Sequence, residues 1–270
     1  MGAQIHPTAI IASSAEIGDG VTVGPYAVIE ENVIIGAGSR IDAHAIIKPF
    51  VCMGEDNPIY SHACVGGEPQ DLKFHGEESW LEIGNRNRIR EFSTMNRGTE
   101  AGGGVTRIGD GGLFMAYCHV AHDCRVGDNV VFSNGATLAG HVEVGDYAIL
   151  GGLSAVHQFC RVGKHAFLGA MSGMGQDLPP YMLASASKGA NSVVYGPNAV
   201  GLRRLGASQQ LIGALRQAYK TIWLQKIPRQ DALAQVTAEF GDFPEITALV
   251  DFLRDAERGF LPGPPEGERE

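Results

Sequence analysis

Apolar residues recur at every sixth position over most of the chain. Counted from Ile5, eleven consecutive positions at this spacing hold an aliphatic residue or methionine, the last of them Val65. The spacing breaks and resumes at Ile83, breaks again, and then runs from Ile108 to Met174. Four residues after each of these positions the side chain is usually small or β-branched. Neither an α-helix, with a period of about 3.6, nor an isolated strand, with a period of about 2, produces such a pattern.

A parallel β-helix explains the six-residue spacing. Each hexapeptide supplies one short strand and one turn, and three hexapeptides form a coil of eighteen residues. The apolar residue fills the interior, and the small residue fits the crowded corner. Successive coils stack about 4.8 Å apart through backbone hydrogen bonds. The spacing alone does not determine the hand of the β-helix. Parallel crossovers in sheets are generally right-handed, and nothing in the six-residue period overrides that rule.

Two polar, glycine-rich segments interrupt the spacing. We expect residues 1–200 to form the β-helix and residues 66–80 and 97–107 to extend from it as loops. Long loops on a compact scaffold often carry function. The six-residue spacing ends near Pro179, and residues 201–270 are expected to form a helical C-terminal domain.

Helix signals define this C-terminal part more closely. Ser208 precedes a helical pattern of apolar residues and is a candidate N-cap. Two further helices are expected, over residues 230–240 and over residues 244–257, the latter beginning at Pro244. The tail from Gly259 onward is expected to be frayed.

Composition excludes several function classes. A formal net charge of −9 does not favour nucleic-acid binding. No apolar run reaches the ~20 residues of a membrane span, and the N-terminus lacks the features of a signal peptide. The five cysteines are an odd number, and a chain of this size needs no disulfides. A cytoplasmic protein is therefore expected.

Histidines gather on one face of the predicted coils. The hexapeptides that begin at residues 120, 138 and 156 are eighteen residues apart and therefore stack. They carry His122, His141 and His157, with His119, Asp123 and Gln158 beside them. We interpret this ridge as a candidate active centre. His44 and His62 are also eighteen residues apart, so stacking without function is the alternative.

A metal site is a rival interpretation of the same residues. His119, His122 and Cys124 lie close together in the sequence, and zinc hydratases with hexapeptide repeats use histidine ligands on this scaffold. Cys124, however, occupies the inward-facing small-residue position, as do Cys118 and Cys160. The chain has no Cys-x-x-Cys pair. We expect neither a metal nor another cofactor.

Six segments resemble a particular family of hexapeptide-repeat acyltransferases. They are residues 69–73 (PQDLK), 83–91 (IGNRNRIRE), 121–124 (AHDC), 138–142 (LAGHV), 155–160 (AVHQFC) and 176–181 (QDLPPY). These segments are similar to the UDP-N-acetylglucosamine acyltransferases. The resemblance implies a left-handed β-helix and the first step of lipid A synthesis. In that step an R-3-hydroxyacyl chain moves from acyl carrier protein to the 3-hydroxyl of UDP-N-acetylglucosamine. It also implies a homotrimer with active sites between subunits.

The resemblance implies roles for individual residues. His122 matches the general base, Asp123 the carboxylate that holds its tautomer, and Gly140 the residue whose N–H faces the oxyanion. No serine or cysteine matches a nucleophile, so direct transfer is implied. The matched substrate-binding residues are Asp71, Lys73, His119, His141, His157, Gln158, Asn198 and Arg204. Val200 stands where the family usually has an acidic nucleotide contact. Arg203, Arg204, Arg216 and Lys220 are candidates either for contact with an acidic carrier protein or for a solvated helix face.

Two other functions remain open at this point. One is an N-acyltransferase acting on a UDP-amino sugar, although such relatives usually carry an extra N-terminal domain and here the repeats begin at Ile5. The other is a non-enzymatic scaffold or a zinc-dependent hydratase.

Overall fold

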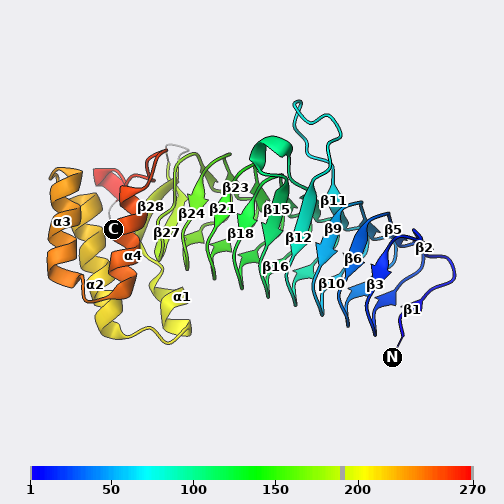
Figure 1. Ribbon diagram of the computed structural model, residues 1–270. Helices are drawn as coiled ribbons and strands as arrows, with labels where there is room; N and C mark the ends of the chain where they lie inside the picture. The colour runs from blue at the N-terminus through cyan, green and yellow to red at the C-terminus, as the bar shows by residue number, and fades with distance from the viewer. Residues whose placement is uncertain (1, 189–191, 269–270) are drawn as a thin grey trace.

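The chain forms a long three-sided β-helix that ends in a group of α-helices (Figure 1). The computed structural model describes residues 2–188 and 192–268. The N-terminus lies at one end of the β-helix, and the α-helices pack at the other end (Figure 1). The six-residue spacing predicted a parallel β-helix and the helix signals after it predicted terminal helices, and this fold is confirmed.

Three sheets form the sides of the β-helix. Sheet A contains, in order, β1 (Gln4–Ile5), β4 (Thr22–Val23), β7 (Arg40–Ile41), β10 (Pro58–Ile59), β13 (Arg88–Ile89), β16 (Leu113–Phe114), β19 (Val131–Phe132), β22 (Ile149–Leu150), β25 (Phe167–Leu168), β27 (Met182–Ala186) and β28 (Ser192–Pro197). Sheet B contains β2 (Ile10–Ile11), β5 (Val28–Ile29), β8 (Ile46–Ile47), β11 (Cys64–Gly67), β14 (Thr94–Asn96), β17 (His119–Val120), β20 (Thr137–Leu138), β23 (Ala155–Val156) and β26 (Gly173–Met174). Sheet C contains β24 (Arg161–Val162), β21 (Glu143–Val144), β18 (Arg125–Val126), β15 (Val105–Ile108), β12 (Trp80–Ile83), β9 (Val51–Met53), β6 (Val33–Ile35) and β3 (Glu16–Ile17).

The register of the strands explains why the spacing resumes after each interruption. Met53 pairs with Ile83, and Ile83 pairs with Ile108, so both loops pass from sheet B to sheet C without shifting the apolar column. Every described pairing is parallel except that of β27 with β28. That antiparallel pair replaces the hexapeptide coils after β26, which is where the six-residue spacing fails. Residues 189–191, within the connection between these two strands, lie outside the described residues.

The two loops are shorter than predicted. Gly66 and Gly67 belong to β11 and Trp80 to β12, while residues 105–107 belong to β15. These strands have four residues, where most strands in the β-helix have two. The loops therefore span residues 68–79 and 97–104, and the second contains a 3₁₀ helix, η1 (Glu100–Gly102).

The interior is apolar and holds the cysteines predicted to face inward. Cys118, Cys124 and Cys160 are buried. Burial raises the pKa of the Cys118 thiol to about 11 and that of Cys124 to about 12. At neutral pH these thiols are protonated and behave as small hydrophobic groups.

The C-terminal helices begin close to the predicted positions. They are α1 (Ala199–Arg204), α2 (Gln209–Tyr219), the π-helical turn η2 (Lys220–Leu224), α3 (Arg229–Phe240), α4 (Pro244–Arg254) and the 3₁₀ turn η3 (Glu266–Glu268). The Ser208 hydroxyl accepts the N–H of Leu211 at 3.1 Å, as expected of an N-cap. Pro244 occupies the first turn of α4, but this helix ends three residues before the predicted residue 257. Among the described residues, no helix has both the length and the apolar character needed to cross a membrane.

The prediction of a frayed tail is wrong for its first residues. The Leu261 N–H donates to the Asp177 carbonyl at 2.9 Å, and the Trp223 indole donates to the Leu261 carbonyl at 2.9 Å. Leu261 is buried. Its apolar side chain and these backbone hydrogen bonds hold the tail against the last coil. Residues 269–270 lie outside the described residues.

Candidate active site

The candidate site lies where two neighbouring coils turn away from sheet B. Asp123 and His141 occupy the same position of successive turns, with left-handed φ angles of 61° and 60°. Asp and His are among the residues that tolerate this conformation best. The His141 N–H donates to the His122 carbonyl at 3.0 Å. Coil stacking therefore brings together residues that are nearly one coil apart in sequence.

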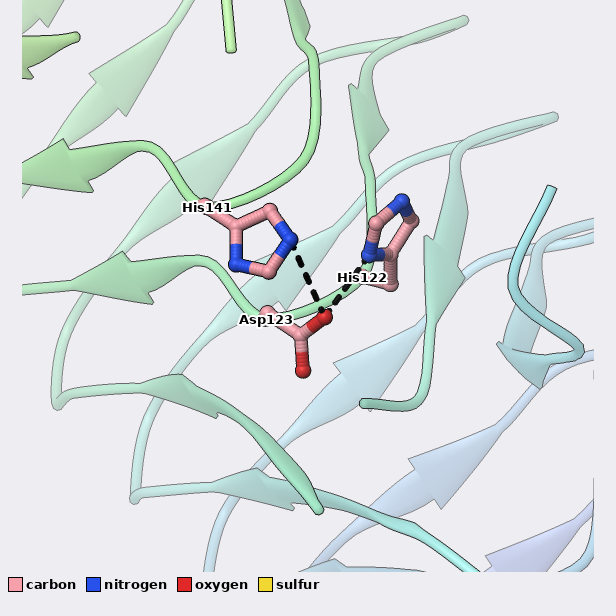
Figure 2. Close-up of side chains that lie close together, drawn as sticks. All are labelled: His122, Asp123 and His141. Carbon is pink, nitrogen blue, oxygen red and sulfur yellow. Dashed lines mark hydrogen bonds and ion pairs between the residues drawn. The ribbon is translucent and has the colours of Figure 1, made fainter. Parts of the chain in front are cut away.

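His122, Asp123 and His141 form a compact cluster (Figure 2). The Nδ1 atom of His122 lies 2.7 Å from a carboxylate oxygen of Asp123, and Nε2 of His141 lies 3.6 Å from the same oxygen. The two imidazole rings are nearly perpendicular, at 88°. The side chain of Asp123 is 1% exposed, whereas those of His122 and His141 are 12% and 24% exposed. The imidazoles are thus open to a substrate while the carboxylate behind them is shielded from solvent.

The second loop and the strand that follows it, β15, supply further partners of Asp123. The Thr99 N–H donates to one carboxylate oxygen at 2.8 Å, and the Thr99 hydroxyl donates to the other at 2.7 Å. The Asp123 N–H donates to the Thr106 hydroxyl at 2.7 Å. Burial raises the pKa of Asp123, but the hydrogen bonds from His122 and Thr99 outweigh it and hold that pKa below its ordinary value. Asp123 is therefore a buried carboxylate anion at neutral pH.

Gly140 lies directly beneath the imidazole of His122. A Cβ atom at this position would lie 2.6 Å from Cε1 and 2.7 Å from Nε2 of His122. Only glycine leaves room for the ring. Among the described residues, the Gly140 N–H donates to no backbone or side-chain acceptor. The backbone of Gly140, with an N–H free to donate, therefore lies against the His122 imidazole.

His119 and His157 lie outside this cluster. The Nδ1 atom of His119 is 2.7 Å from the Thr94 hydroxyl, and burial, with a smaller effect from His122, lowers the pKa of His119. The Nδ1 atom of His157 is 3.1 Å from the carbonyl of its neighbour Gln158, and both side chains are exposed. His157 comes first after its strand, whereas His141 comes third after its own. The ring that stacks on His141, at 4.4 Å, is consequently that of Phe159.

The first loop contributes a polar depression beside the cluster. Asp71, Lys73, Glu77 and Thr99 line part of a cavity of about 410 Å³ between the two loops. The Lys73 N–H donates to the Asp71 carboxylate at 3.0 Å, and the Lys73 side chain is exposed. Burial lowers the pKa of His141, and the charges of Asp123 and Asp71 partly oppose this effect. Asp71 is thus close enough to the cluster to influence its charge.

Asn198 and Arg204 lie elsewhere, at α1. Asn198 is buried and caps this helix, since its side-chain oxygen accepts the Gly201 N–H at 3.1 Å. Its amide group donates to the His165 carbonyl at 3.1 Å. Arg204 is exposed. In the described part of the chain neither residue contacts the His122 cluster, and the side chain of Asn198 is already engaged by the fold.

The cluster also has the composition of a metal site. The donor atoms of His122, Asp123 and His141 lie within 4.8 Å of one another. Both Asp123 oxygens already accept hydrogen bonds from Thr99, and the 2.7 Å contact with His122 is the length of a hydrogen bond. A metal ion would have to displace these contacts. The arrangement therefore suits an imidazole base supported by a carboxylate better than a metal centre.

Sequence reasoning missed Thr99 and Thr106. The only signal for Thr99 was its place in a glycine-rich loop that interrupts the repeat. Thr106 occupies an ordinary strand position and carries no signal of its own. Thr99 reaches Asp123 because its loop folds back over the carboxylate, whereas Thr106 reaches it because β15 stacks on β18, the strand that follows Asp123.

Comparisons with known proteins agree on one family. A family model described as Udp N-acetylglucosamine O-acyltransferase, domain 2, matches residues 177–261, and one described as bacterial transferase hexapeptide (six repeats) matches residues 106–140. A protein of Cupriavidus metallidurans is 56% identical over 264 residues, covering 96% of this chain and 99% of the relative. A protein of Trichlorobacter lovleyi is 52% identical over 260 residues, covering 96% of this chain and all of the relative. Both are named acyl-[acyl-carrier-protein]–UDP-N-acetylglucosamine O-acyltransferase.

Solved structures give the same result. The crystal structure of UDP-N-acetylglucosamine O-acyltransferase from Moraxella catarrhalis superposes with a TM-score of 0.91 at 41% identity, covering 95% of this chain and 99% of that chain. The structure of LpxA from Acinetobacter baumannii also superposes with a TM-score of 0.91, at 42% identity and the same coverage. The similarity therefore extends over nearly the whole chain, helices included.

Proposed function

The chain belongs to the acyl-[acyl-carrier-protein]–UDP-N-acetylglucosamine O-acyltransferase family, and from this premise we propose how its residues perform the transfer. The reaction opens lipid A biosynthesis. In our proposal an R-3-hydroxyacyl group passes directly from the thioester of acyl carrier protein to the 3-hydroxyl of UDP-N-acetylglucosamine. His122 acts as the general base.

The observation that supports this role is the 2.7 Å contact between Nδ1 of His122 and the buried carboxylate of Asp123. A sugar hydroxyl is a poor nucleophile near neutral pH. An imidazole whose Nδ1–H is held by a carboxylate presents an unprotonated Nε2 that takes the hydroxyl proton as the oxygen attacks the thioester carbonyl. Such assistance is typically worth ~10²–10⁴ in rate.

The remaining steps use neighbouring groups. The attack creates a negatively charged oxygen, which the free N–H of Gly140 stabilises. The intermediate collapses by breaking the carbon–sulfur bond. The imidazolium of His122 then returns its proton to the departing thiolate. No acyl-enzyme forms, because His122, Asp123 and His141 carry no hydroxyl or thiol and the buried Thr99 hydroxyl is engaged with Asp123.

The substrates are assigned by charge and position. Asp71 and Lys73 border the cavity beside the cluster, so we assign them to the sugar and the diphosphate respectively. His119, His141, His157 and Gln158 are assigned to substrate positioning along the same edge of sheet B. Both the side chain and the backbone of Asn198 make hydrogen bonds within the fold, so we assign the nucleotide contact expected here mainly to Arg204.

We further propose a homotrimer in the cytoplasm. Residues 1–200 would supply the flat sides that pack against other copies, with residues 201–270 as the helical unit at one end. The five cysteines are free thiols, which suits a reducing compartment. Light scattering of the purified protein measures the assembly, and a monomeric mass with full activity would contradict the trimer.

Product chemistry tests the proposed function. Purified protein is incubated with 3-hydroxyacyl carrier protein and either UDP-N-acetylglucosamine or a UDP-sugar that carries an amine at the reacting carbon. The expected product is an ester at the 3-hydroxyl, identified by mass spectrometry and cleaved by mild alkali. An alkali-stable amide formed only from the amino sugar would instead identify an N-acyltransferase. Loss of activity on chelation, together with stoichiometric zinc, would identify a metal enzyme.

A further inference from the structure

A directed chain of hydrogen bonds ends at the candidate base. The Gly102 N–H donates to the Thr99 hydroxyl oxygen at 3.1 Å. A hydroxyl carries one proton, and toward Gly102 the Thr99 oxygen acts as the acceptor, so its own proton is free for another partner. The Thr99 hydroxyl proton is therefore directed to Asp123, whose carboxylate oxygen lies 2.7 Å away.

This direction determines which atom carries the proton between His122 and Asp123. Asp123 accepts from the Thr99 N–H and hydroxyl, so both of its oxygens act as acceptors. An ionised carboxylate has no proton to give. The proton in the 2.7 Å contact must then reside on Nδ1 of His122, which leaves Nε2 unprotonated.

We propose that Thr99 is a positioning residue that fixes the tautomer of His122 through Asp123. The inference rests on the proposed role of His122 as the general base. It assigns a task to the loop of residues 97–104, which holds the Asp123 carboxylate through Thr99.

The shape of the loop supports this assignment. Thr99 is buried and also caps the short helix η1. A Cβ atom at Gly102 would overlap the Asp123 carboxylate, so the loop approaches the carboxylate as closely as a glycine backbone permits. The Glu100 N–H lies 3.4 Å from a carboxylate oxygen of Glu77, which links this loop to the one that carries Asp71 and Lys73.

Three substitutions test the proposal. Thr99→Val keeps the shape of the side chain and removes the hydroxyl, whereas Thr99→Ser keeps the hydroxyl. Thr137→Val is the matched control, because Thr137 lies in β20 of sheet B and its hydroxyl donates to the Gly135 carbonyl rather than to Asp123. All variants are assayed as the full chain, with acyl carrier protein thioester and UDP-N-acetylglucosamine.

Kinetics give the first readout. Thr99→Val is expected to lower kcat about tenfold, a part of the ~10²–10⁴ that a general base supplies, with little change in KM. Thr99→Ser and Thr137→Val retain the wild-type kcat. Because Thr99 acts through Asp123, adding Thr99→Val to Asp123→Asn causes no further loss. An unchanged kcat for Thr99→Val, a Thr99→Ser variant as slow as Thr99→Val, or multiplying losses in the double variant would each overturn the proposal.

The tautomer itself gives the second readout. Nitrogen NMR of protein labelled with ¹⁵N-histidine distinguishes the two neutral tautomers, and the His122→Gln variant assigns the signal. Wild type is expected to show Nδ1 protonated, and Thr99→Val a mixture. If the tautomer of His122 is unchanged in Thr99→Val, the proposal is wrong even if kcat falls. This measurement needs no substrate, so it separates failure of this inference from failure of the proposed transfer reaction, which the wild-type assay tests alone.

Discussion

Replacing Gly140 by alanine tests the geometry of the candidate site most sharply. The added Cβ would lie 2.6 Å from Cε1 of the His122 ring, whereas two carbon atoms rest about 3.5–4.0 Å apart. The backbone of Gly140 is not in the left-handed region, so alanine introduces no backbone strain. Relief of the overlap therefore requires the imidazole to move by about 1 Å, a displacement that can cost ~10² in rate.

The expected result is a kcat about 10²-fold lower for Gly140→Ala, with thermal stability within about 1 kcal/mol of wild type. The assay follows transfer from acyl carrier protein to UDP-N-acetylglucosamine, and calorimetry measures the unfolding temperature. Gly152→Ala is the control, because Gly152 occupies the corresponding turn position at another corner and its Cβ would meet the Asn134 carbonyl oxygen at 3.4 Å and the Ser133 Cβ at 4.0 Å, both ordinary contacts. A Gly140→Ala enzyme as fast as Gly152→Ala would refute the placement of His122 over Gly140.

Three other changes test separate parts of the account. Asp123→Asn should lower kcat by ~10²–10⁴ in the same transfer assay, because an amide cannot accept hydrogen bonds at both side-chain atoms as the two carboxylate oxygens do. A wild-type kcat would contradict the role of Asp123. Burial lowers the folded pKa of His141 below 6.5, so its contribution to the free energy of unfolding is complete above pH 6.5 and is lost as the pH falls through that value. Urea unfolding at pH 7.5 and pH 5 should therefore show that His141→Gln loses less stability on acidification than wild type. An equal loss of stability would contradict this prediction. Arg97 is buried, and its Cζ lies 5.5 Å from the centre of the Phe50 ring and 5.2 Å from that of Phe74. Arg97→Met should therefore loosen the first loop and speed hydrogen exchange over residues 68–79. Unchanged exchange would argue against this anchoring.

Much of the fold could be predicted because the repeat is a strict geometric signal. Each apolar residue of the six-residue spacing fills one side of one coil, so Ile83 and Ile108 were recognisable on either side of the second loop. The loop boundaries were less accurate. The strands beside them are longer than the two residues of a regular repeat, and no residue type marks that extension.

The site was predicted in part. Coil stacking predicts that residues 123 and 141 meet, and the structure brings them together; the roles that the resemblance implies for His122 and Gly140 stay predictions. His157 lies two residues before the position that stacks on His141, since eighteen residues after His141 comes Phe159, so it was wrongly grouped with His141 in the predicted ridge. Thr99 was not predicted, because its contact with Asp123 depends on how the irregular loop of residues 97–104 folds back. The sequence also did not reveal that the Asn198 side chain caps α1 and is therefore engaged within the fold.

The central claim is that the His122 imidazole removes the proton from the sugar hydroxyl. The most direct test is the single-turnover rate of acyl transfer to UDP-N-acetylglucosamine by His122→Ala, with an unchanged circular dichroism spectrum and assembly. The account predicts a rate at least ~10² below that of wild type. A variant that transfers the acyl chain at close to the wild-type rate would contradict it.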